Sequence, residues 1–86
     1  MQLTFFSDPG HGWLMAPRSL VERLGIQDKI SSCSYQKADR VYLEEDCDAP
    51  LLIRALKAEG VEVTIKESNS PDRDSRIRNY NGYRSN

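Results

Sequence analysis

A run of carboxylates is the densest chemistry in the sequence. It comprises Glu44, Glu45, Asp46 and Asp48, between a predicted strand and a predicted helix. One interpretation is helix capping at a solvated edge, because carboxylates there interact favourably with the helix dipole and free N–H groups. The other is a docking surface for a basic protein, because clustered negative charge steers association. The spacing matches no calcium loop, so we expect no metal site and no cofactor.

A second polar group surrounds the first predicted turn. Asp8 and His11 lie in that turn and Trp13 follows it. A His with one Asp can support acid–base chemistry, but no motif ties a Ser or Cys nucleophile to this pair. We interpret them as a turn Asp and a surface His, with Trp13 either in the core or as an exposed anchor for a partner. We therefore predict no catalytic residues.

The last segment combines arginine with tyrosine. Such a mixture suits protein interfaces and the stacking of nucleic-acid bases alike, and it can also be a solvated tail without function. Two aspartates, Asp72 and Asp74, dilute its positive charge. The candidate partner-binding residues here are Arg73, Arg76, Arg78, Tyr80 and Tyr83.

The two cysteines, Cys33 and Cys47, are too few and too widely spaced for a disulfide scaffold, and they lack zinc-site spacing. We expect reduced, partly buried thiols.

Length and charge limit the alternatives. Eighty-six residues make one small domain, for which a second copy or a partner would add apolar burial. Residues 1–70 hold eight Lys/Arg and eleven Asp/Glu, whereas residues 71–86 hold four Arg and two Asp. An acidic body argues against broad binding to phosphate backbones. No apolar run spans a membrane and the first residues resemble no secretory signal, so we expect a cytoplasmic protein without a membrane partner.

Hydrophobic patterning predicts seven elements. A hairpin is expected over residues 2–16, with strands 2–7 and 13–16 and a turn at Asp8-Pro9-Gly10. Pro17 begins a short helix, and Gly25 stops it in the left-handed conformation. Strands follow over 30–35 and 40–45.

The second half of the pattern is a helix followed by a strand. Asp48 is the expected N-cap of a helix over 50–59, and Gly60 ends it. The apolar stripe of this helix is Leu51, Leu52, Ala55 and Leu56. The strand 61–66 alternates cleanly, with three aliphatic side chains toward the core, and its long link allows parallel pairing with strand 40–45.

The sequence thus predicts a single α+β domain of order ββαββαβ, with a mostly antiparallel sheet and two short helices on one face. Residues 1–67 form the compact domain, and residues 68–86 form a flexible Arg/Tyr-rich tail that orders on a partner.

The segment Gly12–Leu43 resembles the swapped-hairpin family of transition-state regulators and antitoxins (the AbrB and MazE type). The matching residues are Gly12, Pro17, Leu20, Leu24, Gly25 and Ile26. This resemblance implies an intertwined homodimer that binds DNA or a toxin. Because residues 2–16 carry no Lys or Arg, the basic face would come from Arg18, Arg23 and Lys29.

The whole chain also looks like small proteins carried by phages and other mobile elements. This resemblance rests on the stretches SDPGHGWL, VYLEEDCDAP and DSRIRNY. It implies an accessory protein that docks on a host protein and blocks it.

The leading expectation is therefore a non-enzymatic binding protein from a phage or mobile element. It would inhibit or regulate a host protein or complex, with a nucleic-acid-guided defence complex (anti-CRISPR-like) as the favoured class. The alternative is a dimeric DNA-binding regulator or antitoxin of the swapped-hairpin type.

Overall fold

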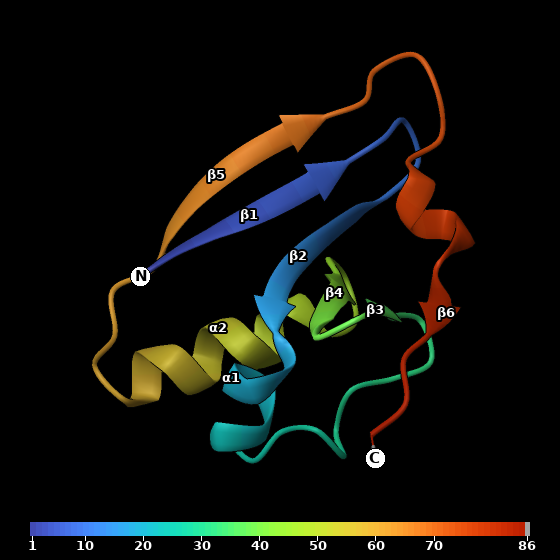
Figure 1. Cartoon of the computed structure of the whole chain (residues 1–86). Coiled ribbons are helices and arrows are strands. Elements are labelled where there is room, and N and C mark those ends of the chain that lie inside the picture. Colours follow the sequence, from blue (N-terminus) through green and yellow to red (C-terminus); the bar gives the residue numbers. More distant parts are fainter. Residues whose placement is uncertain (86) are drawn as a thin grey trace.

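The structure, a computed structural model, describes residues 1–85. Helices and strands follow one another in the order shown in Figure 1. They are β1 (Gln2–Ser7), β2 (Gly12–Pro17), α1 (Arg18–Arg23), β3 (Tyr35–Lys37), β4 (Arg40–Glu44), α2 (Ala49–Ala58), β5 (Thr64–Asn69), the 3-10 helix η1 (Arg76–Asn79) and β6 (Asn81–Gly82). The predicted order ββαββαβ is found, and η1 and β6 extend it.

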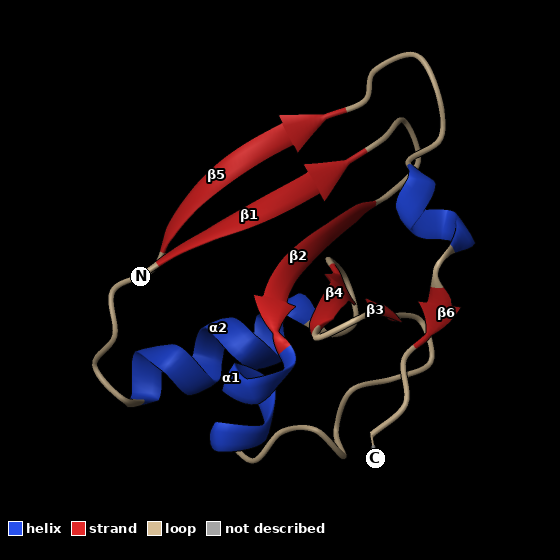
Figure 2. Cartoon of the chain, in the orientation of Figure 1, coloured by secondary structure: helices blue, strands red, loops and turns tan. Residues whose placement is uncertain are grey.

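One mixed sheet organises the chain. Its six strands lie in the order β5-β1-β2-β4-β3-β6, and every neighbouring pair is antiparallel except β1 with β5. Figure 2 shows these strands together with the two helices. The α+β class predicted from the sequence is confirmed, as is the mostly antiparallel character of the sheet.

The main core lies between one face of the sheet and the two helices. Strand alternation places Leu3, Leu14 and Leu43 on that face. Helix α1 adds Leu20 and Val21, and α2 adds Ala49, Leu52 and Leu56. As predicted, α1 is followed by Gly25 at a φ of 71° and α2 by Gly60 at 75°, the left-handed conformation that glycine adopts freely.

The opposite face of the sheet carries a second, aromatic core. Trp13 and Tyr42 point to this face and are 2% and 7% exposed. Ile77 of η1 packs against them at 2% exposure. Tyr80 follows, with its ring centroid 5.1 Å from that of Tyr42. Burial of these large side chains requires the C-terminal segment, because η1 supplies the cover for this face.

The predicted flexible tail covers residues 68–86, of which residue 86 lies outside the described residues. Residues 68–69 instead complete β5, and residues 75–83 pack on the domain through η1, β6 and Tyr83. Strand β6 pairs with β3, and Figure 1 shows η1 and β6, in red, along the side of the molecule away from both helices. Tyr83 is 8% exposed, and its hydroxyl donates to the carbonyl of Gln27 at 2.7 Å. The segment holds few apolar residues, which is why a flexible tail was predicted. The three that could be buried, Ile77, Tyr80 and Tyr83, all pack on the domain.

Two predicted strands are displaced. Residues 30–34 form turns and coil, and the strand begins only at Tyr35. In this segment Ser31 and Ser34 donate hydrogen bonds to the Asp48 carboxylate, and such local polar contacts compete with a regular strand ladder.

The last predicted strand is shifted as well. It begins at Thr64 instead of Val61, and it pairs in parallel with β1 rather than with β4. Both edges of β4 are already occupied by β2 and β3, whereas β1 had a free edge. Ile65, expected in the core, is 45% exposed.

No helix of the described residues has the length and apolar character needed to cross a membrane.

We expect Ile77→Ala to lower the free energy of unfolding by about 2–4 kcal/mol, because it leaves a cavity in the aromatic core. Ile65→Ala is the matched control, and its cost should stay below about 1 kcal/mol because Ile65 is 45% exposed. Urea denaturation followed by Trp13 fluorescence measures both. Equal costs for the two variants would show that η1 contributes nothing to stability.

Candidate binding surface

The connection between β4 and α2, residues 45–48, separates two hollows in the surface. On one side is an apolar groove of about 700 Å³ between α2 and the β1–β5 half of the sheet. On the other side is a polar pocket of about 400 Å³ near the β1–β2 turn. We call them the apolar groove and the polar pocket.

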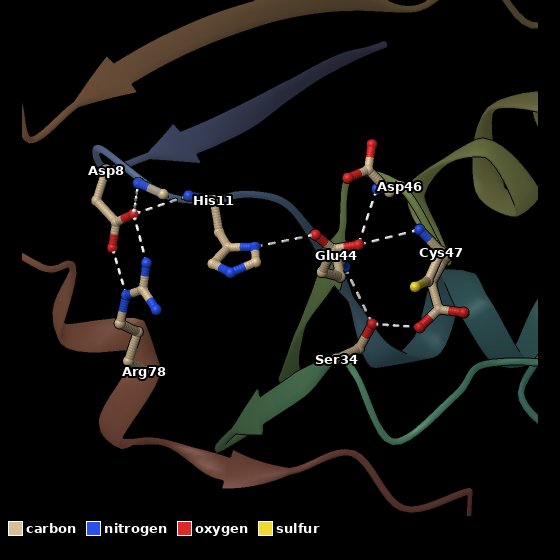
Figure 3. Close-up of polar contacts among 9 residues, drawn as sticks. Asp8, His11, Ser34, Glu44, Asp46, Cys47 and Arg78 are labelled. Atoms are coloured by element: carbon tan, nitrogen blue, oxygen red, sulfur yellow. Dashed lines mark hydrogen bonds and ion pairs between the residues drawn. The ribbon is translucent and has the colours of Figure 1, made fainter.

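Asp8 fixes Arg78, which lines the polar pocket, and Figure 3 shows the contact between the two side chains. Its side chain is fully buried and accepts two hydrogen bonds from the Arg78 guanidinium, at 2.6 and 2.8 Å. Backbone N–H groups of Gly10, His11 and Ser75 donate to the same carboxylate. Asp8 was expected to be a simple turn residue, but it also ties η1 to the first hairpin.

This environment changes the acidity of Asp8. The Arg78 guanidinium holds the pKa of the Asp8 carboxyl well below its ordinary value, and the backbone donors add to this effect against the opposing influence of burial. The same contact raises the pKa of Arg78. Asp8 and Arg78 therefore remain charged across the physiological range.

Glu44 turns back onto its own loop. One carboxylate oxygen accepts the backbone N–H groups of Asp46 and Cys47, at 2.8 and 3.0 Å, and the other lies 3.5 Å from Nδ1 of His11. Burial raises the pKa of Glu44, but the donated hydrogen bonds outweigh it and the pKa lies below its ordinary value. The His11 side chain is half exposed, as expected for a surface His.

Asp48 occupies the N-cap position of α2, yet its side chain makes no capping bond. It is 2% exposed and instead accepts bonds from the backbone and hydroxyl of Ser31 and from the hydroxyl of Ser34. Ser34 in turn accepts the backbone N–H of Glu44 at 3.0 Å. The predicted capping role of the Asp48 side chain is wrong, because Ser31 and Ser34 of the loop before β3 occupy its carboxylate oxygens.

The acidic run is thus divided. Glu44 and Asp48 are buried and satisfied within the chain, whereas Glu45 and Asp46 are exposed. Glu45 lines the apolar groove, and Asp46 lines the polar pocket. Only this second pair is placed to meet a partner without rearrangement of the loop.

The candidate arginines and tyrosines of the last segment also divide into residues bound within the chain and residues that are exposed. Arg78 is bound to Asp8, Tyr83 is in the main core, and Tyr80 packs on Tyr42. Arg73 and Arg76 are exposed. The structure does not bring these five residues together with the acidic run as one surface, although Arg78 and Asp46 share the polar pocket.

Two of the three cations considered for DNA binding have partners within the chain. Arg18 donates to Gln36 at 2.5 Å and lies 5.3 Å from the ring centroid of Tyr83. Arg23 forms an ion pair with Glu59 at 3.1 Å. Lys29 is exposed.

Sequence reasoning missed the apolar groove. It identified one stripe on α2, but Pro50 and Ile53 form a second apolar surface that faces the groove. Ala49 of α2 adds to this surface, and the sheet and the residues after α2 complete the apolar lining with Phe5, Leu14, Val61, Val63 and Ile65. The sequence did hold a signal for this second surface. Helix α2 begins with five consecutive apolar residues, Ala49 to Ile53, which extend around more of the helix than a single apolar stripe does.

The cysteines also differ from expectation. Both Cys33 and Cys47 are exposed rather than partly buried, and both line the polar pocket. Among residues 1–85, no group of three or more His, Cys, Asp or Glu is arranged to hold a metal ion.

No family model, curated protein or solved structure matches the chain.

We expect Asp8→Asn to lower the Tm by about 5–10 °C at pH 7, because it leaves the Arg78 charge without its partner. The stabilisation from Asp8 is fully present above its ordinary pKa of 3.8 and is lost as pH falls below that value, since the folded pKa is depressed. The wild type should therefore lose stability below pH 4 more steeply than the variant. Circular dichroism melts from pH 7 to pH 2.5 measure both curves.

Asp72→Asn, at an exposed position of the same segment, is the control and should match the wild type. If the Tm of Asp8→Asn and that of the wild type fall equally steeply below pH 4, Asp8 does not carry the stabilising charge assigned to it.

Proposed function

We propose that the chain is a non-enzymatic binding protein that docks on a basic protein through the apolar groove and so regulates or inhibits it. The observation that carries the proposal is the groove itself. Eight apolar side chains line it in the folded monomer. Concave apolar surfaces of this kind, rimmed by a few charged groups, mark interaction sites.

The shape of the groove favours a helical segment of the partner. Helix α2 forms one wall over Ala49–Ala58, which corresponds to about 15 Å of helix. The opposite wall is the β1–β5 pair, and Figure 1 shows both strands running past α2 without another element over them. An amphipathic helix of two to three turns can place its apolar face in such a groove.

The charges of the groove favour a basic partner. Glu45 precedes α2 and Glu62 follows it, so a carboxylate stands near each end of the wall, and Lys57 is the one cation in the lining. Asp46 lies next to Glu45 and adds exposed negative charge to that end. A segment with an apolar face and a Lys or Arg near each end is therefore the complementary ligand.

The chemistry of the polar pocket supports a role in binding rather than catalysis. Its thiol at Cys47 has a pKa raised to about 12, mainly by the neighbouring Cys33 side chain, with burial and the nearby Glu44 carboxylate adding to the effect. An activated cysteine nucleophile needs the opposite shift. His11 is paired with a carboxylate but is not part of a nucleophile–base pair.

More specifically, we propose that the target is a host protein, with a nucleic-acid-guided defence complex as the favoured class. Proteins that bind nucleic acid expose Lys and Arg for phosphate contacts, and this is the chemistry that Glu45, Asp46 and Glu62 complement. The resemblance to small phage proteins adds to this form of the proposal.

The test is capture from nuclease-treated lysate of a bacterium that carries defence systems, followed by affinity measurement on the recovered protein. Ile65→Glu places a charge in the groove at an exposed strand position, and Glu45→Lys with Glu62→Lys reverses its rim. We expect each variant to weaken binding by about tenfold or more. Biolayer interferometry with the purified partner gives the dissociation constants.

Glu22→Lys with Asp28→Lys makes the same change in net charge at exposed positions outside the groove, and it should bind within about twofold of the wild type. If both charge-reversed proteins bind equally weakly, net charge and not the rim of the groove controls the affinity, which would contradict the proposal. Recovery of nucleic acid alone, from untreated lysate only, would replace the proposal with the swapped-hairpin regulator.

A further inference from the structure

Two thiols that are distant in the sequence meet at the polar pocket. Cys33 lies in the loop before β3, and Cys47 lies in the connection between β4 and α2. Both side chains line the pocket and both residues are exposed. A small oxidant in solution can therefore reach them.

The loops that carry the two cysteines are fixed to each other by Asp48. This residue directly follows Cys47, and its carboxylate accepts both donors of Ser31 and the hydroxyl of Ser34, on either side of Cys33. The hydroxyl of Ser31 also accepts the backbone N–H of Cys33 at 3.2 Å. Because Asp48 and Ser34 are buried, this arrangement holds the two thiols at a set separation.

The two thiols share one pocket on loops that Asp48 joins. The Cys33 side chain is also the main reason that the pKa of Cys47 is raised to about 12. A disulfide needs the two Cβ atoms only about 4 Å apart, a separation that loops joined in this way favour.

We propose that Cys33 and Cys47 are a redox-active dithiol, which a low-molecular-weight disulfide oxidises to an intramolecular bond. The Cys33 thiolate attacks one sulfur of the external disulfide, whose S–S bond breaks and releases one thiol. Cys47 then loses its proton and attacks the Cys33 sulfur, which releases the second thiol. The two cysteines are oxidised, the external disulfide is reduced to two thiols, and the two protein protons end on those thiols.

The order of attack follows from the environment. Cys47 keeps its proton because of its raised pKa, so it acts second, when the mixed disulfide is already beside it. Glu44 contacts the backbone N–H of Cys47 and is a carboxylate in the folded state, which makes it a nearby acceptor for that proton.

The bond would act on the loop that separates the two hollows. It closes residues 33–47 into a ring that contains β3 and β4 and ends beside Glu45 and Asp46. A crosslink over a loop of this size stabilises the folded chain by restricting the unfolded one. The oxidised protein should therefore have a Tm about 10 °C or more above that of the reduced protein.

The test treats the full chain with glutathione disulfide and measures intact mass and thermal unfolding. The wild type should lose two hydrogen atoms, retain no bound glutathione and gain thermal stability, and reduction should reverse all three. Cys47→Ser should instead retain one glutathione on Cys33, Cys33→Ser should take up glutathione more slowly because Cys47 keeps its proton, and neither variant should gain stability. The double variant, Cys33→Ser with Cys47→Ser, sets the baseline Tm.

Accumulation of singly or doubly glutathionylated wild type, or of a disulfide-linked dimer, would overturn the proposal. So would an internal disulfide that leaves the Tm unchanged, because the loops would then have rearranged to form it. The test is independent of the docking proposal, because no partner protein is involved.

Discussion

The ion pair between Asp8 and Arg78 is the constraint on which the far face of the sheet depends. The buried Asp8 carboxylate in the β1–β2 turn fixes Arg78 of η1, whose guanidinium lies 5.6 Å from the ring centroid of Trp13. With η1 held there, Ile77 covers Trp13 and Tyr42. The first turn and the last segment are thereby joined across 70 positions of the chain, and the aromatic face is kept from water.

Buried carboxylates also fix the loop between the two hollows. Glu44 and Asp48 satisfy backbone and serine donors, so the loop is fixed from within by two of the four carboxylates. This leaves Glu45 and Asp46 exposed at defined positions. A dense acidic run thus serves two purposes, one structural and one proposed here for docking. The buried pair also aligns the cysteine-bearing loops, so the docking and redox proposals share one rigid connection.

Local signals predicted much of the fold. The hairpin of β1 and β2, both helices and the stops at Gly25 and Gly60 follow from short-range patterning, which sequence shows directly. Pairing over long separations was not visible. The parallel register of β5 with β1 depends on which edge remains free, and the order of residues 70–85 depends on a buried charge that composition cannot reveal.

The candidate site was predicted only in part for the same reason. Glu45 and Asp46 belong to the run that the sequence singled out, but the apolar groove arises where α2 and β5 approach from separate segments. Ile65 illustrates the difference. Its strand alternation correctly predicted an inward side, yet α2 does not reach β5, so the side chain lines an open groove instead of a core.

Amide hydrogen exchange on the complex with the captured partner tests the docking surface most directly. The account predicts slower exchange in α2 and in residues 61–69 when the partner binds, with little change in residues 18–29. Protection confined to residues 18–29, with α2 and β5 unchanged, would contradict it and place the interface on the face that carries Arg18, Arg23 and Lys29.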